Sequence, residues 1–250
     1  MVIAVFILVH WYLAGFCQTF FLHRYASHRM FSMPLIWERF FYLVSLVSQG
    51  IICMPPKAYA IMHRMHHAYT DTDKDPHSPH IHKDPFRMAF NTAVVFLNLF
   101  ADPSKSEPRF DEDCPTWPAL DRLIARRTFR VLWALALVWF YVWFYGHFAS
   151  ARWVYVFLPV HFYMGLIHGT VANWCGHRYG YRNFESNNLS KNLACIDFFL
   201  MGESLHNNHH SRPWLPNFAA KPSEMDPTYE ISKLFSRLGI LQFNEKSRTR

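Results

Sequence analysis

The sequence lacks the motifs of several common protein classes. Its five cysteines are odd in number and form no C-x-x-C pair, which argues against a disulfide framework or a cysteine-ligated zinc site. It has no G-x-G-x-x-G for a dinucleotide and no cytochrome-type haem motif. The formal net charge is +7, but Lys and Arg are scattered without a compact basic stripe, so we predict no nucleic-acid partner.

What the sequence does contain is apolar residues gathered into runs. Hydrophobic residues make up 51% of the chain and aromatic residues 18%. A membrane-spanning helix needs about 20 mainly apolar residues, so these runs predict an all-α integral membrane protein. The first run has no basic start and no convincing cleavage site, which predicts a retained anchor rather than a signal peptide. The four runs are residues 2–22, 35–54, 131–148 and 153–172.

Two polar segments, residues 57–130 and 176–250, hold most of the Lys and Arg, whereas the short 149–152 turn holds one Arg. The positive-inside rule therefore predicts that both segments form a cytoplasmic cap. The histidines after the first and second runs share one compartment only if residues 35–54 lie at the membrane interface rather than cross it. We predict a single domain over residues 1–250, with three to four membrane helices plus an interfacial helix under a helical cap.

Sixteen histidines are present, and eight of them fall into three clusters. HRYASH ends the first run, and two H-x-x-H-H segments follow later, one in each polar block. Positions i, i+3 and i+4 share a helix face, so each H-x-x-H-H is expected to aim three imidazoles at a common point. Eight imidazoles exceed one octahedral metal, so we predict a dimetal site, whose element the ligands alone do not choose. The clustered residues are His23, His28, His63, His66, His67, His206, His209 and His210.

Other polar residues near these clusters are candidates for supporting roles. Asn173 and His177 lie four apart at the end of the fourth run, where His177 is a candidate ninth ligand and Asn173 a candidate holder of a metal-bound water. We expect Asp71, Asp75 and Glu203 to orient ligand histidines from behind, with solvation or helix capping as the alternative for the aspartates. The remaining histidines of the apolar runs are interpreted as satisfied surface or capping residues: His10, His147, His161 and His168.

Four blocks, HRYASH, HRMHHAYTDTDKDPHSP, NWCGHRYGYR and GESLHNNHHSRP, resemble the integral-membrane fatty acyl desaturase family in order and spacing. The resemblance covers nearly the whole chain. It implies a few membrane helices under a cytoplasmic cap, and two irons bound by nine histidines, with Asn173 contributing through a water. The implied iron ligands are His23, His28, His63, His66, His67, His177, His206, His209 and His210.

The resemblance also implies an activity: O2-dependent insertion of a double bond into a long acyl chain, with carbon 9 as a candidate position. The substrate is carried by CoA, a carrier protein or a membrane lipid, and the electrons come from a ferredoxin or a small cytochrome. Relatives generally start with a membrane helix before the one that ends in the first box, and this sequence does not show that earlier helix; residues 49–63 also look a few residues longer here. A lipid hydroxylase of the same superfamily and a non-catalytic metal carrier or transporter are the alternatives.

Overall fold

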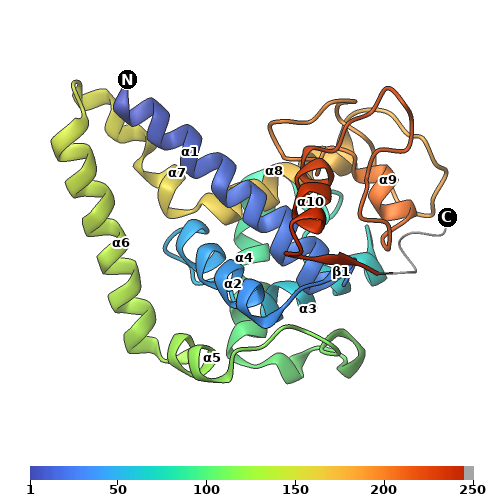
Figure 1. The fold of residues 1–250 in the computed structure, drawn as a ribbon, viewed down its shortest axis with the longest axis horizontal. Helices are drawn as coiled ribbons and strands as arrows, with labels where there is room; N and C mark the ends of the chain where they lie inside the picture. The colour runs from blue at the N-terminus through green and yellow to red at the C-terminus, as the bar shows by residue number, and fades with distance from the viewer. Residues whose placement is uncertain (245–250) are drawn as a thin grey trace.

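The computed structural model describes residues 1–244 and is mainly helical, as predicted (Figure 1). One short antiparallel pair joins β1 (Phe31–Ser32) to β2 (Gln242–Phe243). Residues 245–250, part of the expected cap, lie outside the described region. The helices are α1 (Val2–Phe16), the π-helix η1 (Cys17–Ser27), α2 (Leu35–Ser48), α3 (Pro56–Tyr69), α4 (Pro85–Ala101), α5 (Pro118–Ala125), α6 (Arg127–Phe148), α7 (Leu158–Phe162), α8 (Met164–Arg178), α9 (His206–Ser211) and α10 (Pro227–Arg237), with 3-10 turns η2 (Pro103–Lys105), η3 (Pro108–Phe110) and η4 (Arg152–Phe157).

Two helices among residues 1–244 are long and apolar enough to cross a membrane. The first joins α1 to η1 over Val2–Ser27, and the second is α6. Figure 1 shows α6 standing apart from the other helices, and only 11% of its most apolar window is buried. Its exposed face carries Leu132, Leu135 and Trp139, as expected for a helix surrounded by lipid.

The fourth apolar run is not the single straight helix that its hydropathy predicts. It divides into η4 with α7 and then α8, with a bend of 75°. The backbone at the bend bonds to the segment after α2: Ile51 N donates to Phe162 O at 2.9 Å, and Gly165 N donates to Gln49 O at 3.2 Å. A broken helix is tolerated at membrane depth where protein groups satisfy its backbone, and here residues 49–51 do so. The pair counts as a third candidate span if it is taken as one segment.

The second run is also shorter than the predicted helix over residues 35–54. Helix α2 ends at Ser48, so its 14 residues extend about 21 Å against a hydrocarbon core of about 30 Å. Gly50 follows with φ +94°, and a Cβ there would overlap the carbonyl of Phe162. Helix α2 therefore ends where the chain turns to meet the bend before α8.

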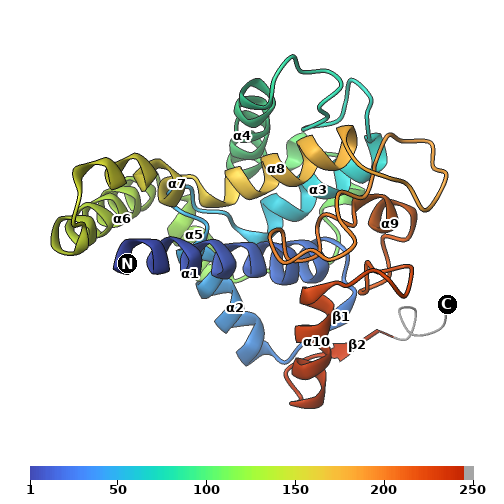
Figure 2. The ribbon, with the colours of Figure 1, turned by 90° about the horizontal axis from the view of Figure 1, so that it is seen from above.

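The main core gathers where η1, α2 and α3 meet. Phe20, Phe21 and Leu22 of η1 are fully buried and pack with Phe41 of α2 and Ile61 of α3. Figure 2 shows α6, α7 and the start of α1 at one end of the molecule, with α3, α9 and η1 toward the other. The histidine clusters therefore lie at the end of α1 that is remote from the N-terminus.

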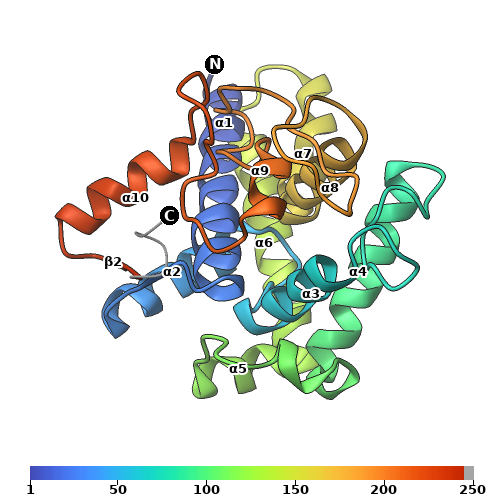
Figure 3. The same ribbon diagram turned by 90° about the vertical axis from the view of Figure 1, so that its right-hand side faces the viewer.

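A buried ion pair ties the C-terminal part of the chain to η1. Arg24 donates to Asp226 at 2.7 Å, and neither side chain is exposed. Asp226 also caps α10 by accepting from Tyr229 N. Figure 3 shows α10 and α4 on opposite sides of the helices at the centre. All five cysteines are free thiols, as the sequence predicts.

Candidate metal centre

The π-helix η1 positions the first histidine pair. The amide of His28 donates to the carbonyl of His23 at 3.2 Å, an i to i+5 bond of the π type. Residues five apart therefore lie one turn apart, and the two ring centroids are 5.0 Å from each other. In a regular α-helix a spacing of five would turn the second ring about 140° away. The five-residue spacing was visible in the sequence, but the π-helix was not predicted.

The second and third clusters lie on α3 and α9. Helix α3 starts at Pro56, whose missing N–H costs nothing at the first helical position, and carries His63, His66 and His67 on its last turns. Helix α9 is six residues long and carries His206, His209 and His210. The ninth histidine, His177, comes from the last turn of α8.

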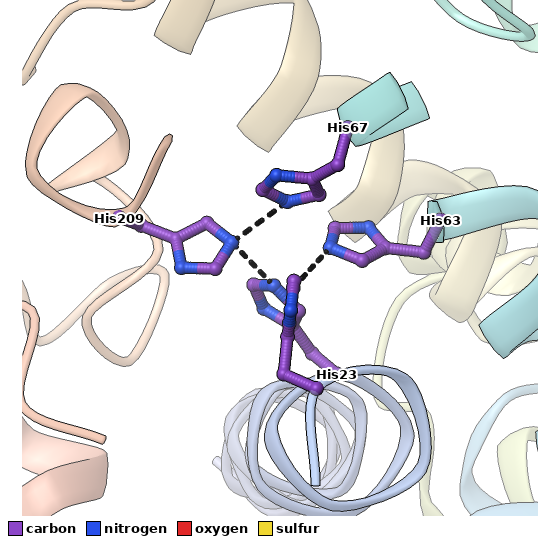
Figure 4. Close-up of side chains that lie close together, drawn as sticks. His23, His63, His67 and His209 are labelled. Carbon is purple, nitrogen blue, oxygen red and sulfur yellow. Dashed lines mark hydrogen bonds between the residues drawn. The ribbon is translucent and has the colours of Figure 1, made fainter. Parts of the chain in front are cut away.

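Five histidines converge on one point, and we call them the five-histidine group. Nε2 of His209 lies 2.9 Å from Nε2 of His23 and 2.9 Å from Nε2 of His67. Figure 4 shows these rings and that of His63 turned toward one another, His23 from η1, His63 and His67 from α3, and His209 from α9. Nε2 of His28 lies 2.9 Å from Nε2 of His63. The group comprises His23, His28, His63, His67 and His209.

The other four histidines form a second, fully buried set, the four-histidine group: His66, His177, His206 and His210. Nε2 of His210 lies 3.2 Å from Nε2 of His66 and 3.1 Å from Nε2 of His206. Nε2 of His206 lies 3.0 Å from Nε2 of His177. All nine predicted histidines thus fall into two groups.

Each H-x-x-H-H segment contributes to both groups, so the expectation that its three rings share one point is wrong. On α3, His63 and His67 enter the five-histidine group and His66 the four-histidine group. On α9, His206 and His210 join the four-histidine group and His209 the other. At 100° per residue, i and i+4 differ by about 40°, whereas i+3 lies about 100° from i+4, so the i+3 ring leaves the helix on the other flank.

Three carboxylates stand behind the rings, where they were predicted. Glu203 accepts from His23 Nδ1 at 2.8 Å, Asp75 from His66 Nδ1 at 2.9 Å, and Asp71 from His177 Nδ1 at 3.1 Å. Burial would raise the pKa of Asp75, but the adjacent His66 lowers it well below its usual range, so the carboxylate is ionised. A neutral imidazole that donates from Nδ1 keeps a lone pair on Nε2, the atom that points into each group.

This donor set fits metal ions. Lone pairs 2.9 to 3.2 Å apart repel unless a cation lies between them. Bonds of about 2.1 Å at right angles place two imidazole nitrogens about 3.0 Å apart, which is the spacing found here. Burial, reinforced by the neighbouring rings, lowers the pKa of His63, His206 and His210 well below the ordinary histidine value. These three rings are therefore neutral, the form that binds metal.

Asn173 lies outside both groups. Its Nδ2 donates to Gly169 O at 2.8 Å, while its buried Oδ1 has no protein partner within residues 1–244. It lines a cavity beside His63. An unpaired amide oxygen in that position is compatible with the predicted water-holding role.

Sequence reasoning missed His77, which is buried with its ring centroid 4.3 Å from that of His66. Neither of its ring nitrogens has a protein partner in the described chain. Its position two residues after Asp75 in the DPH segment was the available signal.

Four other histidines were predicted to be satisfied surface or capping residues, and this prediction was only partly right. His147 is exposed, but His10, His161 and His168 are buried. His10 Nδ1 and His161 Nδ1 lie 2.7 Å apart.

A cavity begins at the five-histidine group and runs between α3, α4 and α8. We call it the α3–α8 cavity. His63 and Asn173 lie at the metal end, and Phe96, Leu166 and Met54 are among its apolar walls. A mainly apolar space that touches the candidate metal centre has the chemistry of a hydrocarbon site.

The known proteins to which this chain is similar include acyl-lipid and acyl-CoA desaturases. The chain is 29% identical over 241 residues to an sn-1 stearoyl-lipid 9-desaturase of Anabaena variabilis, covering 95% of this chain and 82% of that relative. It is 27% identical to an sn-1 stearoyl-lipid 9-desaturase of Synechocystis sp., covering 87% of this chain and 64%, a little under two thirds, of that relative. An acyl-CoA C20 Delta5-desaturase of Anemone leveillei is 29% identical, with 90% and 68% covered.

The sequence model of one family, described as fatty acid desaturase, matches residues 1–222. This match takes in both histidine groups, the carboxylates behind them and the α3–α8 cavity. The chain belongs to the fatty acid desaturase family.

Proposed function

We propose that this protein inserts a double bond into a long-chain acyl group, at two irons held by the nine histidines. The observation that carries the proposal is the contact between the candidate metal centre and the α3–α8 cavity through His63, with Asn173 beside it in the lining. When bound, the two irons would supply the reductive activation of O2 that removal of hydrogen from an unactivated CH2 requires. The five-histidine and four-histidine groups would each hold one iron.

The residues of the chain would position the acyl group and keep bulk water away from it. Each buried methylene contributes about 0.8 kcal/mol, so the apolar walls would dominate affinity for the substrate. Holding one C–C bond at about 3 to 3.5 Å from the reacting centre is the positional contribution of such a cavity. The carboxylates Glu203, Asp75 and Asp71 would fix the orientation of three ligand rings.

The substrate to test first is a stearoyl group, with the new double bond at carbon 9. Its support is that two relatives are stearoyl-lipid 9-desaturases. A CoA-linked chain is the second substrate, because another relative acts on acyl-CoA.

We place the metal centre on the cytoplasmic side of the membrane, with an external ferredoxin or small cytochrome as electron donor. Support comes from charge: four arginines lie where α5 meets the start of α6, and only Arg152 lies in the turn after its other end. Arg122, Arg126 and Arg127 are exposed and have no ion pair in the described residues, so they are free to attract an acidic donor. Turnover with NAD(P)H alone, without an added carrier protein, would contradict this dependence.

The decisive experiment expresses the chain in a host that lacks desaturases, with a competent electron donor. His67→Ala removes one ring of the five-histidine group, and His147→Ala, an exposed histidine outside both groups, is the matched control. We expect unsaturated acyl chains from the wild type and from the His147 variant, and none from the His67 variant. Product that gains an oxygen would identify a hydroxylase, and an unchanged lipid profile from the wild type would refute the proposal.

A further inference from the structure

A second cavity, distinct from the α3–α8 cavity, lies between α1 with η1 on one side and α8 on the other. We call it the α1–α8 cavity. Its lining includes His23 and His63 of the five-histidine group and His206 of the four-histidine group. It therefore touches both halves of the candidate metal centre.

Buried polar atoms without protein partners face this cavity. They include Nδ1 and Nε2 of His168, Oε1 of Gln18 and Oδ1 of Asn173, none of which meets a donor or acceptor in the part of the chain that the structure describes. His168 is only 5% exposed and Gln18 only 7%. Leaving such a group unsatisfied costs about 1 to 3 kcal/mol, and a roomy cavity with several polar partners normally satisfies them with ordered water.

His168 marks how far the cavity extends from the histidine groups. It lies nine residues before His177 on α8, which corresponds to about 13.5 Å along the helix. The partly exposed Trp11 covers it, with ring centroids 4.0 Å apart, and Trp11 Nε1 donates to Phe199 O at 2.9 Å. The cavity thus runs from the candidate metal centre toward the ring of Trp11.

The two cavities differ in where they lead. Gln18, Tyr59, His63, Gly169 and Asn173 line both, so these residues form the partition between them. Beyond the shared residues the α3–α8 cavity is lined mainly by apolar side chains such as Phe96 and Leu166, with Gln49 and His77 among its polar exceptions, whereas the α1–α8 cavity meets Thr19, Glu203 and His168. A hydrocarbon is suited to the first and water to the second.

The reaction under "Proposed function", on which this inference rests, needs such a second route. For each double bond, one O2 takes two hydrogens from a CH2–CH2 unit, two electrons from the external carrier protein and two protons from water. The O–O bond breaks, two C–H bonds break, a C=C bond forms, and two waters are released. An acyl chain filling the α3–α8 cavity would block that cavity to protons and to product water.

We propose that the α1–α8 cavity is a water path: it holds water hydrogen-bonded to His168, Gln18 and Asn173, which delivers protons to the metal centre and removes product water. His168 acts as a positioning residue that holds water in the path through hydrogen bonds to its ring nitrogens. It binds neither the metal nor the acyl chain.

The test measures entry of a small polar probe, independently of turnover. Azide is mixed with the purified iron-loaded, oxidised protein, and its association rate constant is read by stopped-flow absorbance. His168→Phe removes both nitrogens and narrows the cavity, so we expect azide entry to slow at least ten-fold at unchanged iron content. Ala93→Phe, which changes the α3–α8 cavity alone, is the matched control: it should weaken binding of a stearoyl probe and leave azide entry unchanged.

His168→Ala separates a water path from a merely structural role. It enlarges the cavity and leaves Gln18 and Asn173 in place, so azide should enter at least as fast as in the wild type. Wild-type entry rates in the Phe variant, or equal slowing in the Ala and Phe variants, would overturn the inference. A wild type that admits azide but forms no double bond would instead refute the proposed function.

Discussion

Glu203 offers the sharpest test of how the chain holds its metal centre. Its carboxylate accepts from His23 Nδ1 at 2.8 Å and from the Thr19 hydroxyl. Burial would raise the pKa of Glu203, but His23 and Arg24 lower it below the usual value, so the group is charged. Glu203→Gln keeps the shape and an acceptor oxygen but removes the charge that strengthens His23 as a ligand.

The expected loss of metal affinity follows from the single hydrogen bond between Glu203 and His23. Loss of a partner behind a ligand histidine typically costs 10- to 100-fold in metal affinity. This corresponds to about 1.4 to 2.8 kcal/mol of binding free energy. Because Glu203 contacts the five-histidine group alone, the iron of that group should leave first, whereas Asp75→Asn should weaken the four-histidine group through His66.

The assay dialyses each purified variant against rising chelator concentrations and counts retained iron per chain, with Mössbauer spectroscopy to distinguish the two sites. Glu230→Gln is the matched control, because Glu230 pairs with Lys233 on the exposed face of α10. If Glu203→Gln kept its iron to the same chelator concentration as the wild type and this control, the role assigned to the carboxylate would be wrong.

Three further outcomes are expected. Asp226→Ala should lower the free energy of unfolding by about 3 to 5 kcal/mol, because it leaves Arg24 as a buried charge without its ion-pair partner. Thermal melting in detergent measures this loss. The control is Glu230→Ala, whose free energy of unfolding should stay within about 0.5 kcal/mol of the wild type. Gly165→Val should favour shorter acyl products, because the new Cβ would displace Gln49 into the α3–α8 cavity. Each methylene that the cavity then excludes lowers the affinity for the acyl chain about four-fold. An unaltered chain-length profile would contradict this. Removing iron should lower the melting temperature and adding it back should restore it, because the ion binds the folded state alone; equal melting with and without iron would contradict that.

The sequence predicted which histidines matter better than it predicted their arrangement. Spacing identified His63, His66 and His67 as a face of a helix, because local geometry sets that relation. The assignment of His66 to one group and its neighbours to the other depends on where α9 and α8 lie beside α3, which no local pattern encodes. The same limit applies to η1. The five-residue spacing of His23 and His28 was visible in the sequence, but the π-helical backbone that brings the two rings together was not.

Other misses came from contacts between residues far apart in the chain. Hydropathy predicted one helix over residues 153–172, but the bend after Phe162 depends on backbone bonds to Gln49 and Ile51. His10 and His161 were interpreted as satisfied surface or capping residues, yet each ring finds a partner 151 positions away inside the protein. Periodicity reports the average polarity of a segment, and such pairings do not change it.

The division of α3 and α9 between the two histidine groups links the loading of the two ions. An ion in the five-histidine group fixes His63, His67 and His209, and thereby the rotation of both short helices about their axes. That rotation also sets the directions of His66, His206 and His210. The first ion thus lowers the entropy cost of ordering the site for the second, so uptake by the wild type should show positive cooperativity.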